Sequence, residues 1–242
     1  MTALVFCALM AAGSQDFDAF FEDFAAKRNG IRTLEARFEQ QSVVPEETLV
    51  SKGSLLYVKP RRMLFRYEAP DPTYLIDGTK AYQYEADLQQ VQSYDLEDNP
   101  QTSVFFLGFD DDTSRLREGY QIELFTPDDG VESAKGIRLH PKTKESEEAY
   151  FQTIELCLRA EDLLPYRIHI VNDEESQVTI RVSDFVVNQP LEANADRIFL
   201  PAGTSIIEDD RLDRTAGEEG AYVPEKTLVG GAPSTPAEET KP

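Results

Sequence analysis

The chain is poor in tryptophan, cysteine and positive charge. It has no Trp and only two Cys among 242 residues, and its 24 Lys and Arg stand against 45 Asp and Glu, giving a formal net charge of −21. A nucleic-acid backbone would be repelled by such a chain, which argues against a nucleic-acid partner. High net charge of one sign also favours a soluble monomer.

Long hydrophobic runs are missing as well, because no apolar stretch reaches the roughly 20 residues that span a bilayer. A short apolar run, Leu4 to Ala12, precedes small residues, which is typical of a signal peptide although the usual positive charges are absent. We predict a degenerate signal peptide over 1–14, whose removal would take Cys7 and leave no internal disulfide. The alternatives are an apolar arm packed on the domain, or a lipid anchor at Cys7, which the bulky Phe6 disfavours.

Catalytic and metal-binding motifs are not found. There is no Gly-x-Ser-x-Gly, no Gly-rich phosphate loop and no Cys-x-x-Cys. His140 and His169 fall on the polar faces of expected strands, and no His is near Cys157 in the sequence. The acidic runs 110–112 and 145–148 lack EF-hand spacing. We therefore expect no catalytic residue, metal or cofactor, and a protein that is not an enzyme.

Short strands dominate what is present. The segment Gly53–Tyr94 alternates residues that favour strands with Pro-Arg, Pro-Asp-Pro, Asp-Gly and Ala-Asp turns, which indicates an antiparallel meander. Apolar and polar residues alternate through most strands, so we expect a curved sheet with a single apolar face. The expected strands are Ile31–Val43, Leu49–Val58, Met63–Tyr67, Tyr74–Ile76, Ala81–Tyr84, Gln89–Tyr94, Tyr120–Thr126, Lys135–His140, Tyr150–Leu158, Pro165–Val171 and Gln177–Val187.

Two helices are expected. The first covers Asp16–Asn29, with Asp16 as its cap and Gly30 as its end. Four phenylalanines lie on one stripe of it: Phe17, Phe20, Phe21 and Phe24. Such a stripe packs on a sheet core, lines a ligand cavity, or does both. The second is a short apolar helix over 100–108, with Pro100 at its start and Gly108 at its end.

The order of these pieces resembles the LolA-type carriers of outer-membrane lipoproteins. The likeness rests on GSLLYVK (53–59), a Pro/Arg turn, FRYE (65–68), LIDG (75–78) and a Tyr82-x-Tyr84 strand. It extends to VFFLG (104–108), VSDFVVNQP (182–190) and FLPAG (199–203), and covers roughly Phe17 to Ile207. It implies a mainly β fold, an open half-barrel of about 10–11 antiparallel strands, with short helices as a lid on its concave face.

The resemblance also implies a function. Such a protein would be a periplasmic carrier that takes lipoproteins by their acyl chains from an inner-membrane ABC-type release complex to an outer-membrane acceptor. A lipid- or glycolipid-binding module, or an envelope-sensing regulatory one, could use the same half-barrel. The carrier domain would span 15–207. From 208 to 242 the chain is acidic and rich in Gly, Pro and Thr, and we expect a disordered tail.

The candidate site follows from the same reading. Lid residues are expected to be Phe17, Phe20, Phe21, Phe24, Val104, Phe105, Phe106 and Leu107, and cavity-wall residues Met63, Phe65, Tyr67, Ile154, Leu156 and Leu158. A family arginine beside a Lys-Arg-Pro turn helps to hold the lid closed. Here the turn is Lys-Pro-Arg-Arg, so Arg61 or Arg62 could be this latch.

Overall fold

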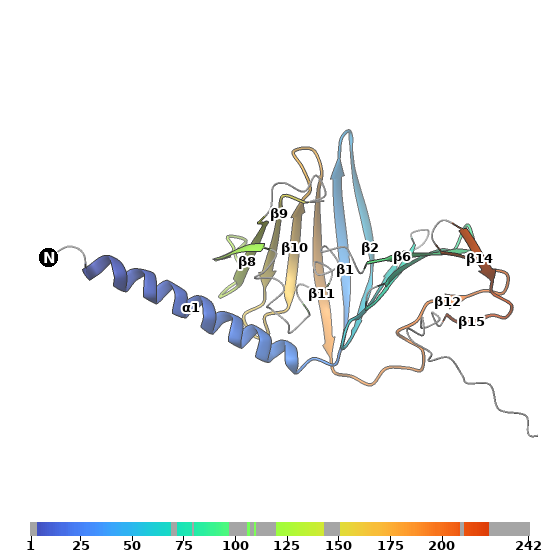
Figure 1. Cartoon of the computed structure of the whole chain (residues 1–242), viewed down its shortest axis with the longest axis horizontal. Coiled ribbons are helices and arrows are strands. Elements are labelled where there is room, and N and C mark those ends of the chain that lie inside the picture. The colour runs from blue at the N-terminus through green and yellow to red at the C-terminus, as the bar shows by residue number, and fades with distance from the viewer. Residues whose placement is uncertain are drawn as a thin grey trace, which may run out of the picture.

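A large open sheet forms the body of the molecule in the computed structural model (Figure 1). The structure describes residues 4–68, 72–78, 80–96, 106, 109, 120–142, 151–208 and 211–222, with the backbone alone for 4–16. The one helix among these residues is α1 (Leu4–Asn29). The mainly β class and the open, unclosed sheet that the sequence predicts are confirmed.

Thirteen strands make the sheet, in the order β14-β13-β6-β5-β4-β3-β2-β1-β11-β10-β9-β8-β7. Its strands are β1 (Thr33–Val44), β2 (Glu47–Val58), β3 (Arg62–Tyr67), β4 (Thr73–Asp77), β5 (Lys80–Glu85), β6 (Gln90–Asp95), β7 (Tyr120–Phe125), β8 (Lys135–Pro141), β9 (Thr153–Leu158), β10 (Pro165–Val171), β11 (Gln177–Val187), β13 (Ser205–Glu208) and β14 (Arg211–Thr215). Two further strands, β12 (Phe199–Leu200) and β15 (Gly220–Ala221), form a small second sheet. All pairs are antiparallel except β13 with β6, which corrects the expectation of a wholly antiparallel sheet.

Helix α1 is longer than predicted, because it begins at Leu4 rather than Asp16. The segment 4–14, part of the predicted signal peptide, contains three Ala, two Leu and one Met and has no Pro, so the strongest helix breaker is missing from it although Gly13 is a poor helix former. Figure 1 shows the N-terminal part of α1 extending beyond the β7–β8 side of the sheet while its C-terminal part runs beneath the strands. No helix of the described residues is long and apolar enough to cross a bilayer.

One face of the sheet, here called the inner face, carries the side chains of Phe38, Met63 and Leu156. Two adjoining apolar clusters lie on it. The first joins Phe20, Phe21 and Phe24 of α1 to buried residues of β7–β9, and the second spans β1–β4 with Phe106 and Phe109. The inner face is therefore the main core of the molecule and the side on which helix and sheet meet.

The opposite, outer face of β2–β6 is also buried, which corrects the expectation of a single apolar face. Leu56, Leu64 and Leu75 point outward and pack under Ile198 and Ile206 from the C-terminal part of the chain. The sequence contains the signal for this, since apolar residues stand side by side at 55–56, 63–64 and 75–76, as in strands covered on both faces.

Residues 211–222 differ from the disordered tail expected over 208–242. Strand β14 pairs with β13, and β15 pairs with β12. Tyr222 is 6% exposed and its ring meets Tyr82 with centroids 5.6 Å apart. The acidic composition predicted disorder, but a few apolar side chains are enough to order this segment because they pack on the apolar outer face of the existing sheet. Residues 223–242 lie outside the described part of the chain.

Candidate functional site

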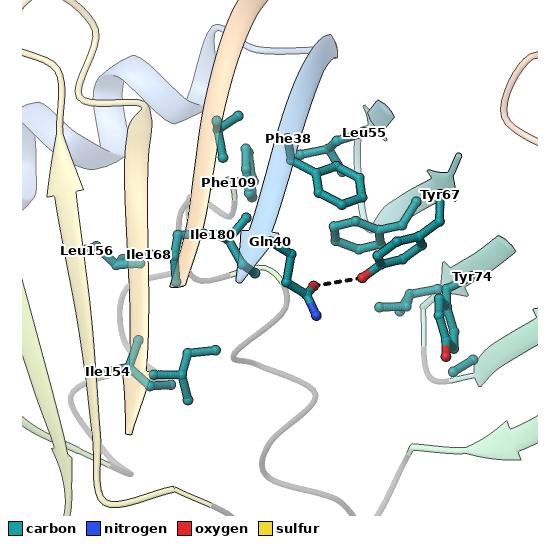
Figure 2. A pocket seen from close by; sticks show the side chains of 15 residues that line it. Phe38, Gln40, Leu55, Tyr67, Tyr74, Phe109, Ile154, Leu156, Ile168 and Ile180 are labelled. Atoms are coloured by element: carbon teal, nitrogen blue, oxygen red, sulfur yellow. Dashed lines mark hydrogen bonds between the residues drawn. The ribbon is translucent and has the colours of Figure 1, made fainter. Parts of the chain in front are cut away.

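An apolar cavity of about 380 Å³ opens on the inner face of the sheet (Figure 2). Its size is within the range of roughly 300–1,000 Å³ common for small-molecule sites. Fifteen residues line it: Phe38, Gln40, Leu55, Phe65, Tyr67, Tyr74, Ile76, Ala81, Phe109, Ile154, Leu156, Ile168, Ile170, Ile180 and Val182. The curvature of the sheet brings strands from both halves of the chain around one hollow.

The structure places four of the six predicted wall residues in this lining: Phe65, Tyr67, Ile154 and Leu156. The other two are buried and are not part of the lining, Met63 in the cluster of β1–β4 and Leu158 in the cluster that includes the α1 phenylalanines. Sequence reasoning missed the lining from β1, β10 and β11, although the alternation of Ile168, Ile170, Ile180 and Val182 in their strands was the signal that could have found it.

The phenylalanines of α1 support the cavity rather than line it. Phe20, Phe21 and Phe24 are at most 9% exposed and share a buried cluster with Ile154 and Leu156, which also line the cavity. Phe17 is half-buried at the margin of the same cluster, with its ring centroid 4.9 Å from that of Phe21. The structure thus brings these four residues together on the inner face, in the cluster beside the hollow and outside its lining.

The C-terminal end of α1 is fastened to the loop between β9 and β10. Arg28, 1% exposed, donates from Nη1 to the Asp162 carbonyl at 3.1 Å and from Nη2 to the Leu163 carbonyl. Its guanidinium lies 4.5 Å from the centroid of Phe24, and Lys27 Nζ donates to the Glu161 carbonyl at 3.0 Å. Burial lowers the pKa of Arg28 to about 10, against the attraction of Asp162. Nothing in the sequence pattern singled out this arginine.

The second predicted lid segment, 100–108, is described at Phe106 only, and Phe109 follows it. Phe106 and Phe109 are 1% and 4% exposed and pack over the inner face of β1–β3. Phe109 lines the cavity and stacks on Tyr57 with centroids 5.8 Å apart. Val104, Phe105 and Leu107, and most of the expected 100–108 helix, lie outside the described residues.

The two adjacent arginines at the β2–β3 turn make contacts on opposite faces of the sheet. The guanidinium of Arg61 lies over the Phe106 ring, 4.5 Å from its centroid. Arg62 binds Asp77 at 2.7 Å and also Asp196, which belongs to the C-terminal segment on the outer face. Arg66, two residues further along β3, donates to the carbonyls of Ala195 and Arg197. Of Arg61, Arg62 and Arg66, it is therefore Arg61 whose described contacts include a predicted lid residue.

Cys157 and the two histidines of the described residues make contacts within the sheet. Cys157 is buried beside Arg167, whose Nη2 lies 3.1 Å from Sγ, and burial raises the pKa of the thiol despite that cation. His140 and His169 each contact a threonine hydroxyl of the next strand, at 3.2 and 3.0 Å. Within the described ranges, no cluster of His, Cys, Asp and Glu could hold a metal ion.

Comparisons with known proteins agree with this architecture. The family model "Outer membrane lipoprotein carrier protein LolA" matches residues 29–197. An outer-membrane lipoprotein carrier protein of Chromohalobacter salexigens is 25% identical over 191 residues, covering 78% of this chain and 86% of that protein.

Solved structures also match this chain, at low identity. A putative outer membrane lipoprotein-sorting protein domain from Vibrio parahaemolyticus is 11% identical with a TM-score of 0.42, covering 73% of this chain and 95% of that one. A LolA superfamily protein from Nitrosomonas europaea is 9% identical with a TM-score of 0.39, covering 72% and 94%. The family match spans most of the sheet that encloses the cavity, and the chain belongs to the LolA family of outer membrane lipoprotein carrier proteins.

Proposed function

We propose that this protein is a periplasmic carrier that holds the acyl chains of lipoproteins in the inner-face cavity. It would take them from an inner-membrane ABC-type release complex and deliver them to an outer-membrane acceptor. One observation carries the proposal: twelve of the fifteen side chains that line the cavity are pure hydrocarbon, and they come from both halves of the sheet. Family membership supports carriage and, at the level of the family, a protein that is not an enzyme.

The energetics favour a cavity that is partly closed before ligand arrives. Each buried methylene contributes about 0.8 kcal/mol. Moving a single long acyl chain from water into the cavity is therefore favourable by roughly 10 kcal/mol or more. A permanently open cavity would hold such a chain too tightly to release it. If the ligand must first displace side chains that already fill part of the hollow, that cost subtracts from the net affinity.

We assign the movable part to the side chains of Phe106 and Phe109. Both side chains lie over the inner face, and Phe109 occupies one side of the cavity itself. Helix α1, in contrast, is fastened through Arg28 to the β9–β10 loop and would act as a fixed wall. Arg61, over the Phe106 ring, would be the latch that favours closure.

Binding of a synthetic lipopeptide with two palmitoyl chains tests the proposal. Ile168→Asn puts an amide into the cavity wall, whereas His169→Asn alters the next residue of β10, on the other face. We expect wild type and His169→Asn to bind alike and to release the lipopeptide to an acceptor lipoprotein or membrane. Ile168→Asn should bind at least about fivefold more weakly, since a buried amide without partners costs about 1–3 kcal/mol. Equal binding by all three would contradict this site, and binding by none would contradict acyl carriage.

A further inference from the structure

The apolar cavity contains one polar group of three side chains: Gln40 from β1, Tyr67 from β3 and Tyr74 from β4. Figure 2 shows the Gln40 amide between the isoleucines of β9–β11 on one side and the two tyrosines on the other. Tyr67 Oη donates to Gln40 Oε1 at 2.8 Å, and the rings of Tyr67 and Tyr74 meet edge to face with centroids 5.9 Å apart. A purely apolar ligand would gain nothing from this group, so its presence inside the hollow calls for a chemical reason.

The hydrogen bonds of Gln40 leave it oriented as a donor. Its Oε1 is occupied by Tyr67, and its Nε2 donates one hydrogen to Ser42 Oγ at 3.1 Å. A glutamine amide nitrogen has two hydrogens, and the second has no acceptor among the described residues. Two partners therefore fix the amide plane while an N–H remains for a ligand acceptor.

The position of Gln40 along β1 matches the head end of an acyl chain. On the inner face of β1, Leu34, Ala36 and Phe38 are at most 5% exposed, whereas Gln40 and Ser42 follow half-buried toward the β1–β2 hairpin. Six residues of strand, from Gln40 to Leu34, span about 20 Å. One leaflet of a bilayer holds hydrocarbon about 15 Å deep, half of the roughly 30 Å core. A tail lying along β1, with the Phe106 and Phe109 side chains displaced, would thus place its first carbon near Gln40.

From this geometry we infer that Gln40, oriented by Tyr67, donates a hydrogen bond to the carbonyl of an ester- or amide-linked acyl chain. The site would distinguish acylated ligands from ether-linked alkyl chains of equal length. This inference rests on the proposed function, because it names which part of the acyl ligand the same cavity reads. Tyr67 acts through Gln40 and is a positioning residue.

A matched pair of probes isolates the carbonyl: one lipopeptide with two palmitoyl ester chains, and the same peptide with two hexadecyl ether chains. Wild type should bind the ester form about three- to tenfold more tightly, the range expected for one net hydrogen bond. Gln40→Leu should reduce the ester-to-ether ratio to about one without weakening ether binding. Tyr67→Phe, which keeps the ring, should lower the ratio partially. Gln41→Leu, one residue along β1 and on the outer face, is the control and should keep the wild-type ratio.

The outcomes separate this inference from the proposed function. Equal binding of both probes by wild type would overturn the carbonyl contact and leave acyl carriage intact. Equal weakening of both probes by Gln40→Leu would make the polar group structural and would also overturn it, whereas binding of neither probe would overturn both. A diacyl and a dialkyl phosphatidylcholine form a second pair of probes. If the protein prefers the ester form in this pair too, the contact recognises acyl lipids in general. If the preference is confined to the lipopeptides, the contact is specific to lipoproteins.

Discussion

Gly53 shows how a single missing side chain shapes the cavity wall. A Cβ at this position would lie 2.3 Å from the Arg66 carbonyl oxygen and 2.7 Å from Phe38 Cζ. The Phe38 ring can therefore lie directly over β2 and form part of the lining only because residue 53 is glycine. The same ring meets Tyr67 edge to face with centroids 5.0 Å apart, so its position also affects the polar side of the cavity.

We expect Gly53→Ala to lower the free energy of unfolding by about 1–3 kcal/mol, because overpacking forces side chains or backbone to shift. Urea denaturation measures it. Gly217→Ala is the control, since a Cβ there meets nothing within 4 Å. An unchanged midpoint for Gly53→Ala would show that β2 and β3 adjust freely, contrary to the tight packing described here.

Arg61 and Arg62 are adjacent in sequence but have separate predicted effects. Arg61→Leu removes the cation over Phe106, a contact worth about 0.5–2 kcal/mol. The closed state, in which Phe106 and Phe109 lie over the inner face, is then less stable and competes less with the ligand. The variant should therefore retain the lipopeptide more tightly and transfer it to the acceptor more slowly. Arg62→Leu leaves Asp77 and Asp196 without their shared cation on the outer face, so it should lower the unfolding midpoint with normal handover. Normal handover by Arg61→Leu would refute the latch.

At the scale of elements, the sequence predicted the eleven strands from β1 to β11 because their alternation and turn residues are strong local signals. The Phe stripe of α1 was likewise visible from its helical spacing. Arg28 was not, since its role depends on carbonyls 134 and 135 positions away in the chain. Strands β12–β15 were also missed: they are two to five residues long, and their pairing with β6 and with each other is decided by tertiary contacts.

The fastening of α1 predicts a large effect from one substitution. Arg28→Leu keeps an apolar stem beside Phe24 but leaves the Asp162 and Leu163 carbonyls without donors. We expect a loss of about 2–4 kcal/mol in the free energy of unfolding, since each unsatisfied buried acceptor costs about 1–3 kcal/mol. Lys27→Leu, beside it and more exposed, should cost under about 1 kcal/mol. Equal midpoints for the two variants in thermal denaturation would contradict the fastening.

The β9–β10 loop should also weaken in acid. Burial raises the pKa of Asp162, but hydrogen bonds from Arg159 and from the Leu164 amide outweigh it and bring the pKa below its ordinary 3.8. The stability from this lowered pKa is thus complete above about 3.8 and is lost as the pH falls through the folded-state value. Asp162→Asn should be less stable than wild type at pH 7 and should lose less between pH 5 and 3. Urea midpoints across that range measure it, with Glu174→Gln in the exposed β10–β11 loop as the control for loss of one charge. Parallel pH curves for wild type and Asp162→Asn would contradict the assignment.

At the scale of the whole molecule, the two halves of the sheet are buried differently. Strands β7–β9 bury their inner face against α1, whereas β2–β4 are covered on both faces, the outer one by the C-terminal segment that contains Ile198, Ile206 and Tyr222. The sequence predicted one apolar face because alternation is clear in β9–β11, and the doubled apolar pairs of β2–β4 were read as strand propensity. Three arginine contacts, from Arg62 and Arg66 to residues 195–197, then fix where the C-terminal segment crosses β3.

Truncation tests whether this outer layer is part of the folded unit. A chain ending at Glu208 loses β14, β15 and Tyr222, so β13 becomes an edge strand and the outer face of Tyr82 is uncovered. Tyr222 alone should contribute about 1.5–3 kcal/mol through burial. We expect the unfolding midpoint of this chain to fall by several degrees. A chain ending at Tyr222 keeps every contact described above and should unfold with the full-length protein. Equal midpoints for all three chains would mean that the inner-face core alone determines stability, and that residues 211–222 are the dispensable tail their composition predicted.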